Sequence, residues 1–290
     1  MIVTVTCNPA IDSTINGEQI VNNIGGKGIN VSKVLKSLNC ESFCTGLLGK
    51  ENGKFICDGL DELGISHHFI EVEGKVRTNT KRIIDKKLFE ENEKGPEVAS
   101  EKLEELKDYL KQFHDDIIVI SGSAPANCDP HFYAELVKNA KQNHNYVILD
   151  CDKQTLKNAL KQRPDAIKPN EDEILRLLEI DDKKKIIDEA LKLDIDLLVV
   201  SLGSEGALFF KDSAVYRCQC PEVDYVSAVG AGDSMVAAMA YAKKNDYSFE
   251  EMIRLAMACA SASVEMSGSN PPEKERINKF LDKVVIEKVR

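Results

Sequence analysis

The sequence of 290 residues contains no tryptophan, and its nine cysteines, an odd number, include no C-x-x-C pair. No apolar stretch approaches the roughly 20 residues of a membrane span. Met1 is followed at once by Ile-Val-Thr-Val-Thr, without the basic stretch that opens a signal peptide. We therefore expect no zinc site and no membrane segment, and we expect reduced thiols in a cytoplasmic protein.

Positive charge is also scarce, because the formal net charge is -10 and the lysines and arginines are scattered along the chain. A chain with this charge distribution lacks the basic patch that a nucleic-acid-binding protein needs. A small anionic ligand is compatible with it, since one or two cations and the backbone N–H groups of a helix N-terminus suffice to bind such a ligand. The expected partner is a small molecule.

Short apolar runs alternate with segments of helical periodicity in the middle of the chain. The runs that we interpret as buried strands are Ile117–Ile120, Tyr146–Leu149, Ala166–Ile167 and Leu197–Val200. Continuous apolar runs are typical of parallel strands covered on both faces, and right-handed crossovers join them into a doubly wound sheet. The sequence predicts an α/β fold, mainly parallel and flanked by helices, in a single domain over residues 1–290.

Residues 67–92 follow a different pattern, with apolar and polar residues alternating in period two and no intervening helix. Together with residues 12–24 they predict a small, partly exposed β-sheet that projects from the main domain as a lid. Helices are predicted at 97–111, 233–244, 248–265 and 273–283.

The segment Ala228-Val-Gly-Ala-Gly-Asp-Ser is a glycine-rich turn that opens directly into a helix. Gly230 and Gly232 free the backbone to turn, and the helix N-terminus favours an anion. Asp233 in the first turn would accept a proton from an attacking hydroxyl. A plain helix start capped by an aspartate accounts for the tetrapeptide alone equally well.

A second glycine-rich turn, Ile24-Gly-Gly-Lys-Gly-Ile-Asn-Val, presents Lys27 and Asn30 to a substrate's hydroxyls or phosphate. It does not match the pattern G-x-x-x-x-G-K-[ST] and is therefore not a P-loop. Asp12 follows the first strand, where ligands approach open α/β sheets, and would hold sugar hydroxyls. Taken alone, Asp12 is more typical of a turn after Asn-Pro.

Two further segments follow predicted strands. In Lys168-Pro-Asn-Glu-Asp-Glu, Asn170 and Glu173 would orient waters around a Mg²⁺–phosphate complex, although a helix-capping pair explains them equally well. Ser201-Leu-Gly-Ser-Glu-Gly is either a phosphate-binding turn or a plain hairpin.

In order and approximate spacing, these segments resemble the ribokinase-like (PfkB) carbohydrate kinase family over essentially the whole chain. The two family signatures match Gly25–Asn30 and Asp224–Ser234. Within this family, five segments resemble the phosphofructokinase and tagatose-phosphate kinase branch: Asn8–Asp12, Arg77–Lys81, Glu91-Asn92 with Gly95-Pro96, Ser121–Pro125 and Lys168–Asn170.

The resemblance implies an ATP-dependent phosphotransferase that uses Mg²⁺ and acts on an alcohol acceptor. It makes Asp233 the general base, with the amides of Ala231, Gly232 and Asp233 as the anion hole and Gly230 also among the catalytic residues. The substrate-binding residues that it implies are Asp12, Gly25, Gly26, Lys27, Asn30, Arg77, Asn79 and Ser123. The nucleotide-binding residues that it implies are Lys168, Asn170, Glu173, Ser201, Gly203 and Gly206, with Glu173 also serving the metal through water.

The resemblance favours fructose 1-phosphate as substrate, converted to fructose 1,6-bisphosphate. Tagatose 6-phosphate or fructose 6-phosphate is the alternative, and a non-catalytic sugar-phosphate sensor is the alternative from another class. Only residues 13–24 separate Asp12 from Gly25, so the lid looks truncated and contains no basic residue there. This shortening weakens the expectation of the lid-mediated homodimer common in the family.

Overall fold

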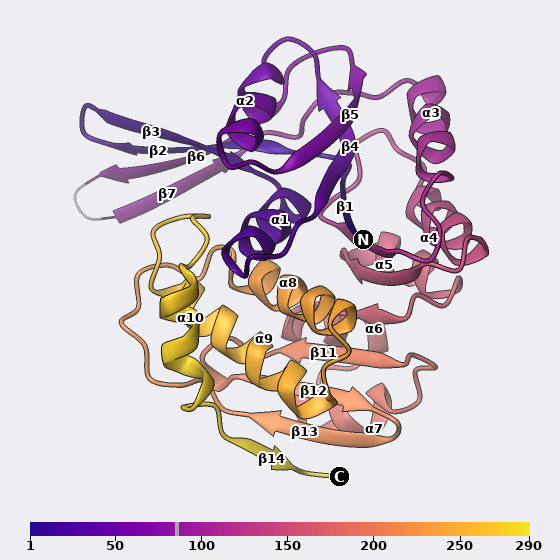
Figure 1. Cartoon of the computed structure of the whole chain (residues 1–290), viewed down its shortest axis with the longest axis vertical. Coiled ribbons are helices and arrows are strands. Elements are labelled where there is room, and N and C mark those ends of the chain that lie inside the picture. Colours follow the sequence, from indigo (N-terminus) through magenta and orange to yellow (C-terminus); the bar gives the residue numbers. More distant parts are fainter. Residues whose placement is uncertain (85–86) are drawn as a thin grey trace.

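The computed structural model describes residues 1–84 and 87–290, which form a large sheet between two helical layers and a smaller projecting sheet (Figure 1). Within these residues the large sheet has ten strands. In spatial order they are β14 (Ile286–Lys288), β13 (Ala214–Cys218), β12 (Ala207–Lys211), β11 (Leu197–Ser201), β10 (Ala166–Ile167), β9 (Tyr146–Asp150), β8 (Ile117–Ser121), β1 (Ile2–Thr6), β4 (Phe43–Gly49) and β5 (Ser66–Val72).

In this spatial order, neighbouring strands are parallel from β11 to β5, that is, along β11, β10, β9, β8, β1, β4 and β5. This arrangement confirms the doubly wound, mainly parallel sheet. The chain leaves β1 toward β4 and later returns to its other side as β8, so the strand order reverses there. Open α/β sheets bind ligands at such a reversal, beyond the carboxyl ends of the strands. Strands β12, β13 and β14 extend the sheet in antiparallel fashion at one edge.

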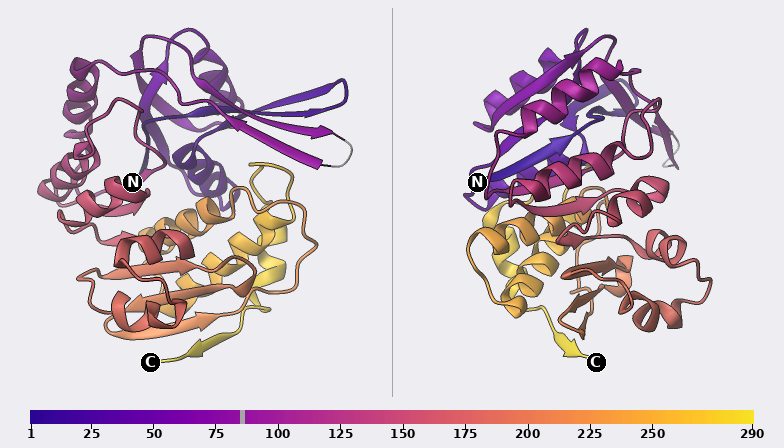
Figure 2. Two further views of the ribbon diagram at one scale, coloured as in Figure 1. Left: turned by 180° about the vertical axis from the view of Figure 1, so that it is seen from behind. Right: turned by 90° about the vertical axis from the view of Figure 1, so that its right-hand side faces the viewer.

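Each inner strand is apolar on both faces because helices cover both. Residues such as Val119, Ile148 and Val199 pack on one side, and their neighbours Ile118 and Leu149 pack on the other. The first side is covered by α1 (Lys27–Ser37), α8 (Ala231–Lys244), α9 (Phe249–Val264) and α10 (Lys274–Leu281). The second side, seen in Figure 2, is covered by α3 (Ser100–Leu110), α4 (Phe132–Gln142), α5 (Lys153–Leu160), α6 (Glu171–Leu178) and α7 (Ile186–Ala190).

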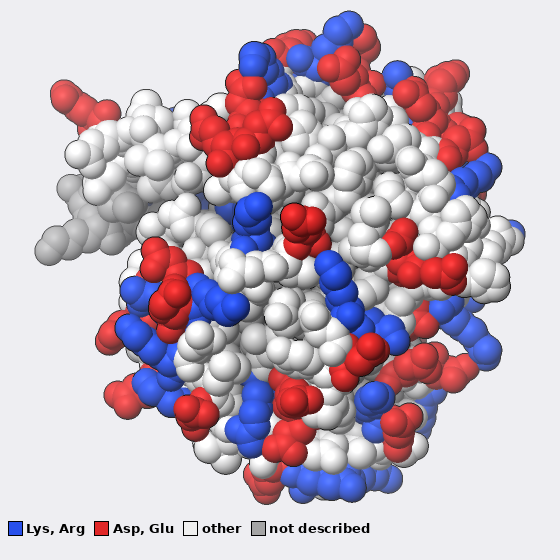
Figure 3. All heavy atoms as spheres, in the orientation of Figure 1, with Lys and Arg blue, Asp and Glu red and all other residues white. Residues whose placement is uncertain are grey.

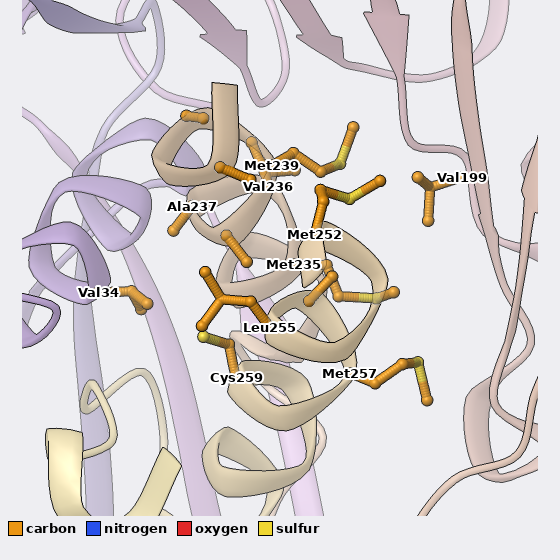
Figure 4. Packing of buried hydrophobic residues seen from close by; sticks show 14 of the residues in the cluster. Val34, Val199, Met235, Val236, Ala237, Met239, Met252, Leu255, Met257 and Cys259 are labelled. Carbon is orange, nitrogen blue, oxygen red and sulfur yellow. The ribbon is translucent and has the colours of Figure 1, made fainter. Parts of the chain in front are cut away.

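Helices α8 and α9 pack closely because their facing residues are small or flexible. Alanines predominate along both helices, and methionines such as Met235, Met239 and Met252 fill the space that remains (Figure 4). Val34 of α1 and Val199 of β11 meet the same cluster from either side. This packing fixes the N-terminus of α8, where the candidate base lies.

The smaller sheet has the order β3 (Gln19–Gly25), β2 (Ala10–Asn16), β6 (Arg77–Ile84) and β7 (Lys87–Asn92). The lid sheet, as we call it, projects from the large sheet beside α2 (Lys54–Glu62). The short segment after Asp12 thus supplies two full strands, since β2 and β3 pair in register from Ala10 to Gly25. Asp85 and Lys86, within the predicted lid segment, lie outside the described residues.

One boundary of the predicted lid was wrong. Residues 66–72 form β5, which pairs in parallel with β4 at the edge of the large sheet. An edge strand covered on one face has the same period-two alternation as a lid strand, so the pattern could not separate them. Helix α2 connects β4 to β5 and makes this segment an ordinary crossover unit.

The remaining elements are two short 3-10 helices, η1 (Lys183–Lys185) and η2 (Gly203–Glu205). No helix in the described part of the chain is both long enough and apolar enough to span a membrane. On the face of the molecule shown in Figure 3, acidic and basic side chains are interspersed without a basic patch.

Candidate active site

A cleft of about 840 Å³ lies between the lid sheet and the carboxyl ends of the strands of the large sheet. It brings together nearly all of the predicted site residues, which come from segments more than 200 residues apart. The predicted residues that line it are Asp12, Gly26, Lys27, Asn30, Arg77, Asn79, Lys168, Asn170, Glu173, Ser201, Gly203, Gly206, Gly230, Ala231, Gly232 and Asp233.

The N-terminus of α8 opens onto this cleft. Gly230 takes a left-handed backbone conformation with φ of 83°, which residues other than glycine seldom adopt. Helix α8 begins at the next residue, Ala231. The N–H of Ala231 already donates to the carbonyl of Ala228 at 3.3 Å. The first-turn amides of Gly232 and Asp233 are therefore the ones that would meet an anion.

Asp233 is only 7% exposed, and its Oδ2 accepts a hydrogen bond from Asn30 Nδ2 at 2.9 Å. Burial, together with the negative charge of Asp150, raises the pKa of Asp233 to about 6, although Lys27, Asn30 and Lys168 oppose the rise. A carboxylate with a pKa near 6 is ionised at neutral pH and accepts a proton more readily than an ordinary aspartate. This is the behaviour expected of a general base.

Asp150 is a second buried aspartate, at the carboxyl end of β9. Its Oδ1 lies 3.3 Å from Lys27 Nζ and 3.5 Å from Lys168 Nζ, and its Oδ2 accepts a hydrogen bond from Ser121. Burial alone would raise the pKa of Asp150, but the two ammonium groups outweigh burial and lower it. Asp150 therefore stays ionised and holds two cations at the edge of the cleft.

Asp12 lies on the lid side of the cleft, where two side chains orient it. Asn79 Nδ2 donates to its Oδ1 at 2.9 Å, and the Ser269 hydroxyl donates to its Oδ2 at 2.9 Å. Gly25 does not line the cleft, but a Cβ there would lie 2.3 Å from Asp12 Oδ2. Gly25 was predicted to bind the substrate; in the structure it leaves room for the carboxylate of Asp12.

Arg77 lines the cleft at the start of β6. Its Nε donates to the backbone carbonyl of Asn8, and its Nη1 donates to Asn79 Oδ1, both at 3.3 Å. Ser123 was also predicted to bind the substrate, but it is not among the residues that line the cleft, and its hydroxyl accepts from Asn8 Nδ2 at 3.2 Å. Ser123 follows a buried strand, as several residues that line the cleft do, so its position in the sequence could not show that it lies outside the cleft lining.

On the opposite side, Asn170 and Glu173 form the predicted capping pair and also line the cleft. Asn170 accepts from the Glu173 N–H at 2.9 Å, and Glu173 accepts from the Asn170 N–H at 2.8 Å, so the pair is a capping box at the start of α6. Both residues nevertheless line the cleft. Likewise, residues 201–206 connect the antiparallel strands β11 and β12 as a hairpin and still face the cleft.

Three functional candidates were missed by the sequence analysis. Asp150 ends a strand that had been predicted, so its position at the carboxyl end was a usable signal. Ser269 lies in the connection between α9 and α10, and Lys33 lies in α1 with only 4% of its surface exposed. Neither has a local pattern that distinguishes it from a surface residue.

The acidic groups around the cleft indicate how a metal ion would be held. Among the described residues, no three histidine, cysteine, aspartate or glutamate side chains converge to bind a metal on their own. Mg²⁺ commonly keeps several waters and binds through one or two carboxylates together with substrate phosphates. Carboxylates such as Glu173 at the cleft fit Mg²⁺ that arrives with a nucleotide.

A buried base, a helix N-terminus and a lid over a cleft together define a phosphotransferase site of the ribokinase-like class. The model of the pfkB family of carbohydrate kinases matches residues 1–276, and the chain belongs to that family. It is 33% identical to a 1-phosphofructokinase of Borreliella burgdorferi over 100% of this chain and 99% of the relative. A tagatose-6-phosphate kinase of Staphylococcus epidermidis is 33% identical over 89% of this chain and 90% of the relative.

The fold agrees with solved structures of the same family. The phosphofructokinase-2 of Escherichia coli in complex with potassium superposes with a TM-score of 0.91 at 25% identity, covering 97% of this chain and 98% of that chain. The likeness to this structure confirms the mixed α/β fold with its large, mainly parallel sheet.

Proposed function

We propose that this protein is an ATP-dependent kinase that phosphorylates fructose 1-phosphate to fructose 1,6-bisphosphate in the cytoplasm. The observation that carries the proposal is the meeting of Asp233 and the N-terminus of α8 with Asp12 and Arg77 across one cleft. Two relatives that match most of the chain are named as kinases of phosphorylated ketohexoses, which supports this class of substrate.

The sugar is proposed to lie between the lid sheet and Asp233. Asp12, oriented by Asn79 and Ser269, would accept hydrogen bonds from sugar hydroxyls, because both of its oxygens are held in place before the substrate arrives. Arg77 would hold the phosphate that the sugar already carries, since a guanidinium presents several N–H donors to an anion.

Transfer would then need alignment and charge stabilisation rather than a covalent intermediate. Asp233 accepts the proton of the attacking hydroxyl. The amides of Gly232 and Asp233 and the positive end of α8 stabilise the charge on the phosphoryl group. Lys27 and Lys168, both held by Asp150, supply further positive charge beside it.

ATP is proposed to occupy the side of the cleft formed by residues 168–173 and 201–206, with its base toward α9. Mg²⁺ bound to the nucleotide would shield the phosphate charge, and Glu173 would hold it through water. Tyr225, Met257 and Ala260 line this side of the cleft, which gives it the apolar surface that a nucleobase requires.

A homodimer through the lid sheet is also part of the proposal. The hairpin of β2 and β3 is complete, and it exposes Ile20 and Val21 to solvent at 62% and 54%. Phe89 of β7 is 53% exposed. A second copy of the chain would cover such residues, and sedimentation velocity of the wild type and an Ile20→Glu variant tests this.

The function is tested by ADP release from Mg-ATP with fructose 1-phosphate, tagatose 6-phosphate, fructose 6-phosphate and unphosphorylated fructose in parallel. We expect the largest kcat/KM with fructose 1-phosphate. A preference for one of the 6-phosphates would replace the proposed substrate and keep the class of reaction. Tight sugar-phosphate binding without ADP release would identify a sensor and overturn the proposal.

A further inference from the structure

Lys33 is a buried lysine behind the cleft that the proposed reaction leaves without a role. It is 4% exposed and is not among the residues that line the cleft, unlike Lys27 and Lys168. A buried ammonium group is costly unless its donors are satisfied, so its partners indicate why it is present.

The three donors of Lys33 reach three different segments. Nζ donates to the carbonyl of Ser269 at 2.6 Å, to the carbonyl of Ile24 at 3.2 Å and to Asn30 Oδ1 at 3.5 Å. Ile24 belongs to β3 at the base of the lid sheet, and Ser269 belongs to the connection between α9 and α10. One side chain thus joins the lid, helix α1 and that connection.

Two of these contacts connect Lys33 indirectly to carboxylates that line the cleft, one through Asn30 to Asp233 and the other through Ser269 to Asp12. Asn30 directs its oxygen to Lys33 and its nitrogen to Asp233, and Ser269 donates its hydroxyl to Asp12. An ammonium group can only donate, so it fixes which end of the Asn30 amide faces Asp233. With the amide reversed, the oxygen of Asn30 would face the carboxylate and repel it.

We propose that Lys33 is a positioning residue for phosphoryl transfer, which orients the base Asp233 through Asn30 and the sugar-binding Asp12 through Ser269. This inference rests on the proposed kinase function. It assigns to one lysine the alignment of the two groups that must meet the same sugar from opposite sides of the cleft.

The electrostatics agree with this geometry. Burial lowers the pKa of Lys33, the charges of Asp12 and Asp233 partly offset this, and the resulting pKa is about 8. The attraction is mutual, so the positive charge of Lys33 favours the ionised form of Asp233. The other groups that act on Asp233 are Asp150, Lys27 and Lys168, in addition to the hydrogen bond from Asn30.

The test compares Lys33→Met with Lys36→Met. Lys36 lies on the same helix and also donates to a backbone carbonyl, that of Gly64. It is exposed, however, and among the described residues it makes no hydrogen bond to Asn30 or Ser269. Steady-state kinetics of ADP release are measured from pH 5 to 9, with the sugar phosphate and ATP varied separately.

Loss of the positive charge should raise the pKa of Asp233, so the acidic limb of kcat/KM should move to higher pH by about one unit. We also expect kcat to fall by about tenfold or more and KM for the sugar phosphate to rise, with KM for ATP unchanged. The Lys36→Met variant should match the wild type in every respect.

A structural role alone would lower thermal stability without moving the acidic limb. An unmoved limb in folded Lys33→Met therefore overturns the inference. Lys33→Gln, which removes the charge and keeps two N–H donors on a shorter side chain, replaces the methionine variant if the latter does not fold, and the same shift is expected. If neither variant folds, Lys33 is a structural residue and the inference fails, whereas an inactive wild type would instead contradict the kinase function.

Discussion

The two walls of the cleft differ in how firmly they are held. On the wall formed by the large sheet and α8, the carboxylates Asp150 and Asp233 and the ammonium group of Lys168 are all less than one-tenth exposed. On the lid wall, Lys81 and Glu90 form an ion pair at 3.4 Å with side chains 22% and 47% exposed. In the proposed reaction, the packed wall would thus supply the chemistry and the lid wall would bind the sugar.

Two aspartates on the packed wall have pKa values shifted in opposite directions. Both are buried, but Asp150 lies between two lysines and Asp233 receives only one amide hydrogen bond. The pKa of Asp150 is therefore lowered and that of Asp233 is raised. In the proposed reaction, Asp150 would serve as a fixed charge and Asp233 as the proton acceptor.

The largest expected effect comes from Asp233→Asn on the packed wall. An asparagine keeps the shape of the side chain and removes proton acceptance, so kcat should fall by about 10²–10⁴-fold. ADP release under saturating substrates measures this loss. Asp246→Asn, an exposed substitution beyond the other end of α8, should leave kcat unchanged, and near-wild-type turnover of Asp233→Asn would contradict its role as base.

Asp150→Asn should lower the free energy of unfolding and also change the pKa of Asp233. Removing one partner of a buried ion pair costs about 3–5 kcal/mol of unfolding free energy, which urea denaturation measures. The pKa of Asp233 should fall, because the negative charge that raises it is lost. The acidic limb of kcat/KM should then move to lower pH, opposite to the shift expected for Lys33→Met. Asp152→Asn, just beyond the same strand and partly exposed, is the control.

On the lid wall, Arg77→Met should weaken binding of the phosphorylated sugar and leave the chemistry intact. Loss of a hydrogen bond to a charged group costs about 1.5–3 kcal/mol, equivalent to a rise in KM of about 10–150-fold. The matched control is Arg82→Met, an exposed arginine on the same strand. If KM for unphosphorylated fructose rises by the same factor, Arg77 does not bind the phosphate.

The smallest effect is the pH dependence of the wild type. Asp233 must be ionised to accept a proton, and its pKa is about 6. We expect kcat/KM to be halved near pH 6 and to fall about tenfold for each further unit of acidity. The pH profile is compared with the melting temperature over the same range, because acid unfolding would produce a loss of activity of a different origin.

The sequence predicted the packed wall more fully than the lid wall. Gly230–Asp233 and Asn170 with Glu173 each occur in a local pattern with a physical meaning, a glycine turn into a helix or a strand followed by a polar cap. The strand that precedes Asn170 was also predicted with the bounds that the structure gives, Ala166–Ile167. Continuous apolar runs carry this information locally.

The lid and the buried network depend on contacts that no local pattern contains. Residues 66–72 alternate like a lid strand, and only pairing with β4 assigns them to the large sheet. Ser269 meets Asp12 across 257 positions, and Asn30 meets Asp233 across 203. Lys33 has the appearance of a surface lysine until the packing of α1 buries it.

The contact between Gly25 and Asp12 constrains how this site can change over time. A methyl group at position 25 would overlap the carboxylate at position 12, even though the two residues are thirteen positions apart. An alanine at 25 is therefore harmful while the aspartate is present. A side chain at 25 is therefore compatible only with a displaced or shortened side chain at 12, so we expect substitution at one of these positions to accompany substitution at the other.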